Sequence, residues 1–190
     1  MKKNIFKSAT IVVLALSFAS FTTLLKKELK VKTSTISWKG YKVTGSHEGN
    51  ITLNDGSLIF ENDKLVGGNF SIDMTSITVT DLEAGQGKEK LEGHLKSDDF
   101  FGIKNHPNAS FVITKVEGEK GAYKVTGDLT IKSKTNSMTF NMSIADNTAT
   151  ANLKVDRSKF DVRYGSPTFF NDLKDKAIYD EFDLNVSLKF

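Results

Sequence analysis

The chain has 190 residues, which is long enough for one sizeable domain and short for two. Its hydrophobic fraction of 38% and charged fraction of 26% are typical of a globular protein and exclude an intrinsically disordered one. It contains no cysteine, which excludes disulfides, thiol catalysis and cysteine-ligated zinc, and its formal net charge is only +3.

Residues 1–19 predict a cleaved secretory signal peptide. Three lysines precede an apolar run over residues 11–19, and Ser17-Phe18-Ala19 places small residues at a cleavage site. The run is about half of the roughly 20 apolar residues that a spanning helix needs, and an uncleaved anchor is the alternative. We therefore expect a periplasmic or secreted protein. Without the three lysines the net charge falls to zero (3 − 3), which argues against a nucleic-acid partner.

Residues 20–33 are expected to form a solvated linker, because a glutamate interrupts their run of lysines. Residues 34–190 are expected to form one domain. Its first predicted strand spans Thr35–Val43, where apolar and polar side chains alternate. The alternation changes phase at Gly40, which predicts a β-bulge. Bulges help a sheet to curve enough to close.

More alternating segments follow, and turn signals separate them. We predict turns at Asn54-Asp55-Gly56 and at Glu61-Asn62-Asp63, where Gly, Asn and Asp tolerate positive φ. Lys88–Lys96 is the only stretch with clear helical spacing, because apolar residues and a histidine recur there at i, i+3 and i+4. This stretch predicts a short helical insert between strands.

The second half of the chain carries the most regular alternation. Tyr123–Ile131 and Met138–Ile144 each place apolar residues on one face, with a polar loop predicted over Ser133–Ser137, so they predict an antiparallel hairpin. Phe182–Phe190 alternates in the same way. The whole pattern predicts about eight strands, as in a sandwich or a closed barrel. A strand as apolar as the last one would be hazardous at an open edge, which favours closure.

Candidate catalytic groups are few and scattered. The three histidines, His47, His94 and His106, lie in different predicted elements and form no zinc motif. A hydrolase would need one of them to meet Asp98 or Asp99, and this stays the enzymatic alternative. We favour structural roles for all five residues, and we expect no catalytic site and no metal site.

Motifs for nucleotide binding and for serine hydrolases give no support to an enzyme. The sequence has no Gly-x-Ser-x-Gly elbow and no Walker motif. Asp156-Arg157 and Arg163 place fixed positive charge near a strand end. We expect a structural ion pair there rather than a functional site.

The apolar side chains are unusually large. The chain has 14 Phe, 4 Met and the single Trp38, which is more aromatic and flexible bulk than a small sandwich needs. In a closed barrel these side chains would surround either a packed core or a cavity for an apolar ligand. Periodicity does not separate these two cases, so a ligand-free interaction scaffold is a third alternative.

Several short motifs follow one another along residues 34–190. They are Ser37-Trp38-Lys39-Gly40, Gly45-Ser46-His47-Glu48-Gly49, Gly68-Asn69-Phe70-Ser71-Ile72-Asp73-Met74, Leu91 with His94-Leu95-Lys96-Ser97-Asp98-Asp99-Phe100-Phe101, Pro107-Asn108-Ala109-Ser110-Phe111, Gly127-Asp128-Leu129-Thr130-Ile131-Lys132 and Asp156-Arg157-Ser158-Lys159-Phe160. This ordered set resembles the YceI-like proteins. One departure is Ser133, where that family often has Gly, and it affects turn geometry rather than the pocket.

The resemblance implies a mainly β fold, an extended eight-stranded antiparallel barrel that is lipocalin-like and carries a short helical insert. It implies an exported binding protein, without enzymatic activity or cofactor, that holds a polyisoprenoid or a similar amphiphilic lipid, such as a quinone or a fatty-acid derivative. Transient membrane contact and a homodimer are further expectations. We expect ten side chains to line the pocket: Trp38, Phe70, Ile72, Phe100, Phe101, Phe111, Phe140, Met142, Leu153 and Phe182.

Overall fold

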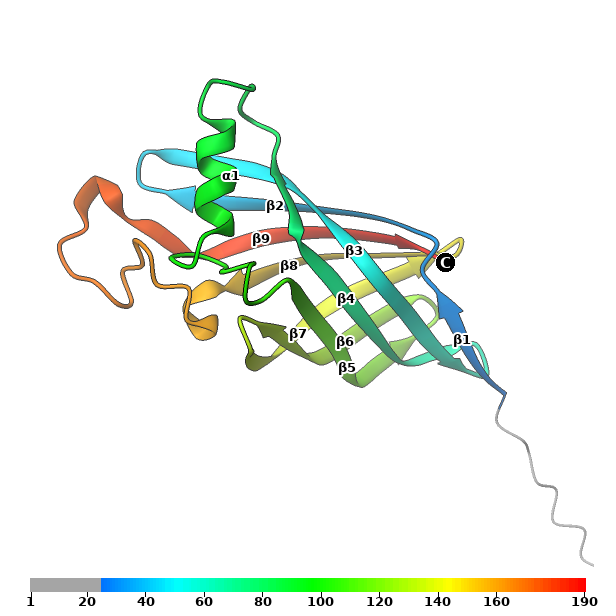
Figure 1. The fold of residues 1–190 in the computed structure, drawn as a ribbon. Coiled ribbons are helices and arrows are strands. Elements are labelled where there is room, and N and C mark those ends of the chain that lie inside the picture. The colour runs from blue at the N-terminus through cyan, green and yellow to red at the C-terminus, as the bar shows by residue number, and fades with distance from the viewer. Residues whose placement is uncertain (1–24) are drawn as a thin grey trace, which may run out of the picture.

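The computed structural model describes residues 25–190, so the predicted signal peptide lies outside the described residues. The described chain forms one antiparallel sheet that curls into a long barrel, with a helix beside one end (Figure 1). The strands are β1 (Lys26–Lys30), β2 (Thr33–Lys42), β3 (Gly45–Glu61), β4 (Lys64–Val79), β5 (Asn108–Glu119), β6 (Ala122–Ile131), β7 (Lys134–Ala145), β8 (Thr148–Asp156) and β9 (Ile178–Lys189). The helices are α1 (Lys88–Lys96) and two short 3-10 helices, η1 (Arg157–Phe160) and η2 (Lys174–Lys176).

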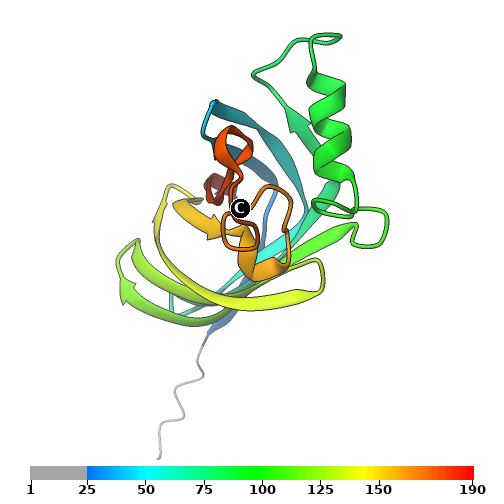
Figure 2. The same ribbon diagram turned by 90° about the vertical axis from the view of Figure 1, so that its left-hand side faces the viewer.

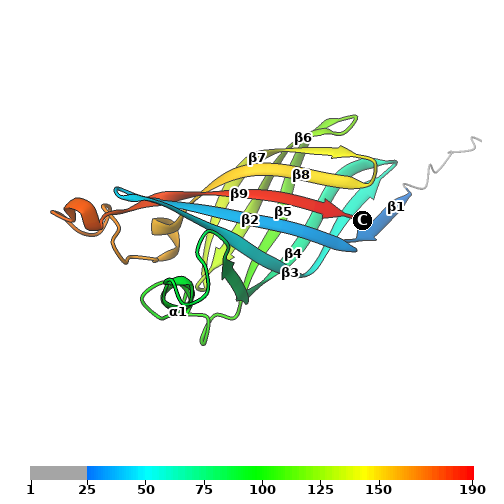
Figure 3. The ribbon, with the colours of Figure 1, turned by 90° about the horizontal axis from the view of Figure 1, so that it is seen from above.

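Eight of the strands form a closed barrel. Their order is β3-β2-β9-β8-β7-β6-β5-β4, and β4 pairs back with β3. Tight turns join β2 to β3, β3 to β4, β5 to β6, β6 to β7 and β7 to β8, whereas the insert with α1 joins β4 to β5 and the segment with η1 and η2 joins β8 to β9. β2 and β9 lie side by side and bring the two ends of the domain together (Figure 3). This arrangement confirms the eight-stranded antiparallel barrel with a short helical insert.

The ninth strand, β1, lies within the described part of the segment 20–33, where we expected a solvated linker. Residues 26–30 form β1, which pairs with residues 57–61 of β3, whereas β2 pairs with the first half of β3. β1 and β2 therefore follow one another along the same side of β3. Leu29 and Val31 lie among the lysines and pack against the core, and this burial explains why the segment is ordered.

β3 continues through the turn predicted at Asn54-Asp55-Gly56, so that prediction is wrong. The β3–β4 pairing shifts register between Leu53 and Asp55, and the turn-like residues lie at this irregularity. A Cβ at Gly56 would come within 2.7 Å of the Phe70 ring. Glycine therefore serves close packing between β3 and β4 here, and the bend helps the sheet to close.

The hairpin turns are tighter than the sequence predicts. The turn at Glu61-Asn62-Asp63 is confirmed, with positive φ at Asn62 and Asp63. Lys132 and Ser133 also have positive φ, so β6 and β7 are joined by a two-residue turn and β7 begins at Lys134. The longer loop predicted over Ser133–Ser137 is therefore wrong, because this turn lacks the usual Asn or Gly.

The barrel end that carries α1, η1 and η2 is called the helix end below. α1 spans Lys88–Lys96 as predicted, and its Leu95 is buried. The Glu92 carboxylate accepts a hydrogen bond of 2.9 Å from Val79 N, which ties α1 to the end of β4. α1 lies to one side of the barrel axis, and the segment between η1 and β9 crosses the barrel end (Figure 2). Loops and a helix therefore border this end together with the strand ends of the barrel.

The opposite end is filled by six buried side chains, called the closed-end cluster: Leu58, Phe60, Leu65, Tyr123, Val125 and Phe190. The rings of Phe60 and Phe190 are 5.8 Å apart, so the last strand packs against the β3–β4 hairpin. Leu65 N donates a hydrogen bond of 3.5 Å to the Tyr123 hydroxyl. This end is a packed core.

Candidate functional site

An apolar cavity occupies the barrel between the closed-end cluster and the helix end. Its volume is about 190 Å³, and the surface that it exposes within residues 25–190 is entirely apolar. An engineered apolar cavity of roughly 150 Å³ stays dry and binds benzene, so a hollow of this size can hold an apolar guest. The barrel interior is therefore hollow, which distinguishes it from a solid scaffold.

The structure places all ten predicted pocket residues in the wall of this cavity. Trp38 comes from β2, Phe70 and Ile72 from β4, and Phe182 from β9. Their contact with a ligand stays a prediction. The wall also includes residues that we did not single out, and most lie on the inward faces of the same strands: Ile36, Gly40, Ile51, Leu53, Met74, Ile77, Leu95, Ala109, Leu129, Ile131, Met138, Ala151, Arg157, Ile178, Tyr179, Leu184, Val186 and Leu188.

A row of three phenylalanines crosses one wall of the cavity. Phe111 lies between Phe70 and Phe140, with ring centres 6.4 Å and 5.5 Å away. Gly127 on the neighbouring strand makes room for this row, because a Cβ there would come within 2.4 Å of the Phe111 ring. These rings make part of the wall aromatic, while Met138 and Met142 on the same wall supply flexible bulk.

Aromatic side chains of the insert cover the helix end. Phe100 and Phe101 are buried with ring centres 5.0 Å apart, and both reach the cavity wall. His94 stacks edge-on against Tyr164 at 4.3 Å and against Phe100 at 5.6 Å. His94 therefore joins α1 to the segment after β8, and it takes the place of an apolar packing residue.

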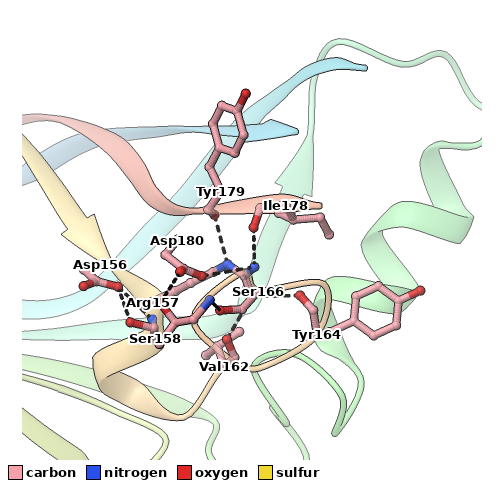
Figure 4. Close-up of polar contacts among 10 residues, drawn as sticks. Asp156, Arg157, Ser158, Val162, Tyr164, Ser166, Ile178, Tyr179 and Asp180 are labelled. Carbon is pink, nitrogen blue, oxygen red and sulfur yellow. Dashed lines mark hydrogen bonds and ion pairs between the residues drawn. The ribbon is translucent and has the colours of Figure 1, made fainter. Parts of the chain in front are cut away.

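Among residues 25–190, Arg157 is the one cation in the cavity wall, and its donors bond to groups of the protein itself (Figure 4). Nη1 donates to the carbonyl oxygens of Val162 at 2.8 Å and Tyr164 at 2.9 Å. Nε and Nη2 donate to the carbonyl oxygens of Tyr179 at 3.1 Å and Ile178 at 2.8 Å. These four bonds hold the segment after β8 against the start of β9.

The remaining partners of Arg157 are a carboxylate and an aromatic ring. Nη2 lies 3.6 Å from Asp180 Oδ1, and the guanidinium lies 5.3 Å from the centre of the Phe100 ring. Burial lowers the pKa of the Arg157 guanidinium, and the carboxylates of Asp180 and Asp156 oppose that shift. Asp156 caps η1 by accepting from Ser158 N at 3.0 Å. The expected structural ion pair is therefore Arg157–Asp180, within a larger network.

The histidines do not meet the carboxylates that the enzymatic alternative requires. His47 Nδ1 is 2.8 Å from Asp81 Oδ2 on the barrel surface, and His106 Nδ1 is 3.2 Å from Ser133 Oγ. Burial raises the pKa of Asp81. The hydrogen bonds with His47 and from a backbone N–H lower it by more than burial raises it, so the pKa lies below the ordinary value. Among residues 25–190, no three His, Asp or Glu side chains gather closely enough to bind a metal ion.

A shallow groove on the surface of the helix end adjoins the cavity, because Ile178 lines both. Tyr179, which also lines the cavity, is 51% exposed, so the cavity approaches the surface beside it. The groove carries charged side chains from four segments of the chain: Lys42, Asp98, Asp99, Lys132, Asp161, Arg163, Asp175 and Lys176. The helix end is therefore the polar end of the molecule.

A family model supports the barrel and the motifs together. The model described as YceI-like domain matches residues 28–190. The chain belongs to the YceI-like family. Among curated proteins, a UPF0312 protein of Pseudomonas putida (strain W619) is 35% identical over 88 residues, which is 45% of this chain and 43% of that protein. A UPF0312 protein of Photorhabdus laumondii is 29% identical over 47% of this chain and 44% of that protein. These alignments span less than half the length of the curated relatives.

Solved structures agree with the YceI-like fold. BcnA of Burkholderia cenocepacia superposes with a TM-score of 0.64 at 24% identity, over 82% of this chain and 94% of that one. A polyisoprenoid binding domain from Saccharophagus degradans, implicated in plant cell wall breakdown, gives a TM-score of 0.56 at 13% identity, over 87% of this chain and 97% of that one. The YceI protein of Campylobacter jejuni gives a TM-score of 0.51 at 17% identity, over 98% of this chain and 96% of that one. In this YceI-like chain, none of the helices within residues 25–190 has the length and hydropathy to cross a bilayer.

Proposed function

We propose that this YceI-like protein binds an amphiphilic lipid, with the tail in the barrel cavity, and that it is a binding protein rather than an enzyme. The observation that carries the proposal is the wholly apolar hollow of about 190 Å³. The polyisoprenoid binding domain from Saccharophagus degradans shares the fold, which supports a polyisoprenoid as the tail. A quinone or a fatty-acid derivative satisfies the same cavity chemistry.

The size of the cavity sets the tail length that it holds without rearrangement. Since roughly 150 Å³ suffices for the six carbons of benzene, about 190 Å³ corresponds to a tail of roughly eight carbons. A longer tail requires wall side chains to move. Met74, Met138 and Met142 are suited to this, because an unbranched thioether chain repacks easily. We therefore infer that a long polyisoprenoid expands the cavity as it enters.

The transfer free energy favours a carrier or reservoir that exchanges with a membrane. Moving a tail out of water gains about 0.8 kcal/mol for each CH₂. Moving it out of a bilayer gains almost nothing, because both surroundings are apolar. A protein of this kind takes up and releases lipid at a membrane and shields it between membranes. Export directed by the signal peptide at residues 1–19 would place this exchange in the periplasm or outside the cell. The lipid would be bound by the barrel domain of residues 34–190.

Exposed aromatic side chains at the helix end support a transient membrane contact. Four aromatic side chains are each between 37% and 51% exposed there: Tyr164, Phe169 and Phe170 in the segment that crosses the barrel end, and Tyr179 at the start of β9. Aromatic rings of this kind are favoured at the interface between lipid and water. The cavity approaches the surface beside Tyr179, so lipid would pass between bilayer and barrel at this end. A homodimer stays a separate expectation, which light scattering on the purified chain would check.

The test combines native mass spectrometry with a variant that fills the cavity. Protein purified from its own host should carry a lipid whose mass identifies it. Ala151 is 5% exposed and lines the cavity, so Ala151→Phe should fill it and reduce bound lipid by at least ~10-fold. Ala122→Phe is the matched control, because Ala122 is exposed on β6. Wild-type protein that is repeatedly free of lipid, or Ala151→Phe that keeps its lipid, would contradict the proposal.

A further inference from the structure

We infer that the lipid held by this protein has an uncharged head group, such as a hydroxyl, carbonyl or amide, and not a phosphate or diphosphate. The inference rests on the proposed function and adds the chemical class of the ligand. An anionic head group needs cations that can leave their own partners to bind it. The structure offers three places for such a group, and each is unsuited to an anion.

The first place is the cavity itself. Its exposed surface within residues 25–190 is entirely apolar. An ionised phosphate inside it would lose its hydration and gain no hydrogen bond in return. The cost of burying an unpaired ion in apolar surroundings is far larger than the gain from burying a tail. The head group must therefore stay outside this hollow, at the helix end.

The second place is Arg157, which is the one cation that the described part of the chain contributes to the cavity wall. A guanidinium has five N–H groups, and four of those of Arg157 already bond to carbonyl oxygens at 2.8–3.1 Å. Nη2 also faces Asp180 Oδ1 at 3.6 Å. An anion at this point would compete with four backbone bonds and would meet the Asp180 carboxylate, whose Oδ1 is buried without a hydrogen-bond partner. Arg157 is therefore unavailable to a phosphate.

The third place is the surface groove that shares Ile178 with the cavity. Four basic side chains line it (Lys42, Lys132, Arg163 and Lys176), and four acidic ones (Asp98, Asp99, Asp161 and Asp175), so its formal net charge is 4 − 4 = 0. Two of the basic groups have internal partners. Arg163 Nε pairs with Asp161 Oδ1, and Lys132 Nζ donates to the carbonyl oxygens of Asp98 and Asp161 at 3.4 Å.

This balance makes the groove suited to a neutral polar group. Carboxylates, carbonyl oxygens and ammonium groups offer both acceptors and donors there, as a hydroxyl, carbonyl or amide requires. A diphosphate would meet four acidic side chains as well as four basic ones, two of which already have internal partners, so the groove offers it no net attraction. The groove therefore discriminates against anionic head groups rather than for them.

The experiment compares two ligands that share one tail, with an uncharged head group in one and an anionic head group in the other. The full mature chain, stripped of bound lipid, is titrated with geranylgeraniol and with geranylgeranyl diphosphate below their micelle concentrations, by displacement of a fluorescent apolar probe. The alcohol should bind at least ~10-fold more tightly, with an affinity that does not change between low and high salt. Equal or tighter binding of the diphosphate would overturn the inference and leave the proposed function intact. Failure of both ligands to bind would instead overturn the proposed function.

A pair of variants shows whether the groove is responsible. Asp98→Asn with Asp99→Asn gives the groove a net charge of +2, and both residues are exposed. Binding of the diphosphate should strengthen severalfold, while binding of the alcohol stays the same. Asp63→Asn with Asp146→Asn makes the same change in charge at hairpin turns of the opposite end, where Asn tolerates the positive φ. An equal effect of both pairs would show that total charge governs binding and would contradict a role for the groove.

Discussion

The guanidinium of Arg157 lies 5.3 Å from the centre of the Phe100 ring, so a buried cation joins the end of β8 to the insert between β4 and β5. The same side chain donates four hydrogen bonds to carbonyl oxygens of residues 162–179. One residue therefore holds together the segments that border the helix end. The contribution of Arg157 to the stability of the fold can be measured, because Arg163 nearby provides a control.

Arg157→Lys should destabilise the fold by about 2–4 kcal/mol, since Lys keeps the charge but cannot reach four carbonyl oxygens in a planar arrangement. Urea unfolding followed by tryptophan fluorescence measures the change, and limited proteolysis should show earlier cleavage within residues 161–177. Arg163→Lys is the control, because the Arg163 side chain is 60% exposed and contacts Asp161 and the Phe169 ring at the surface instead of buried carbonyl oxygens. Equal effects of the two substitutions would contradict this role of Arg157.

Gly49→Ala should be severely destabilising, by more than about 3 kcal/mol. A Cβ at Gly49 would lie 1.8 Å from the Thr78 carbonyl oxygen and 2.8 Å from the Trp38 ring, so either the β3–β4 pairing or the indole must move. Gly40→Ala is the matched control, because nothing lies within 4 Å of its Cβ position. Thermal unfolding monitored by circular dichroism separates them. A tolerated Gly49→Ala would show that the pairing between β3 and β4 is looser than described.

Asp183 should make stability dependent on acidic pH. Hydrogen bonds from Lys154 at 2.7 Å and Tyr41 at 2.6 Å hold the pKa of its carboxyl below the ordinary value. A lowered pKa in the folded state stabilises the fold above the unfolded pKa of about 3.9, and this contribution is lost as the pH falls through the folded value. The Lys154 side chain is 61% exposed and that of Asp183 is 29% exposed, so solvent screens the pair and Asp183→Asn should cost no more than about 1 kcal/mol at neutral pH.

The measurement for Asp183 is urea unfolding at pH 7 and at pH values below 4. The difference in stability between wild type and Asp183→Asn should shrink toward acid, because the wild-type carboxyl is then protonated. Asp146→Asn, at the exposed turn between β7 and β8, serves as the control. A difference that stays constant with pH would show that the carboxylate charge has no role in these hydrogen bonds.

Phe190→Ala should open the closed end of the barrel. Phe190 is 6% exposed and packs 5.8 Å from Phe60, so removal of its ring should cost about 3–5 kcal/mol in stability. Release of a bound lipid to vesicles should also become faster, because a second exit appears. Stopped-flow transfer to quencher-labelled vesicles measures the rate. Lys189→Ala is the control, since Lys189 is exposed on the same strand. An unchanged release rate in Phe190→Ala would mean that lipid leaves by the helix end alone.

The strands could be predicted because one face of each is apolar. Tyr123–Ile131 and residues 182–190 alternate over their whole length, and the structure gives both as strands with inward apolar faces. The helix at Lys88–Lys96 followed from its spacing in the same way. Closure could only be argued from the danger of an open edge. The partner that closes the barrel, β4 against β3, depends on register shifts that alternation does not encode.

The candidate site was predictable in its composition but not in its form. The ten expected residues lie on apolar faces, and a closed barrel places such faces inside. Whether the interior is hollow depends on the volumes of side chains from all eight strands, which no single segment determines. The role of Arg157 was also hidden, because its four acceptors are carbonyl oxygens from residues 5 to 22 positions later in the chain. β1 was missed because its lysines outnumber its apolar residues.

The six residues packed behind the cavity make the barrel a blind tube. A long lipid would enter with the end of its apolar tail first, and it would leave by the same path. Its orientation is therefore fixed on entry, with the polar tip always turned toward the surface that delivered it. Dwell time should then grow with the length of the guest, because each further carbon must be withdrawn past the same narrow rim. Such a tube would sort its guests by length.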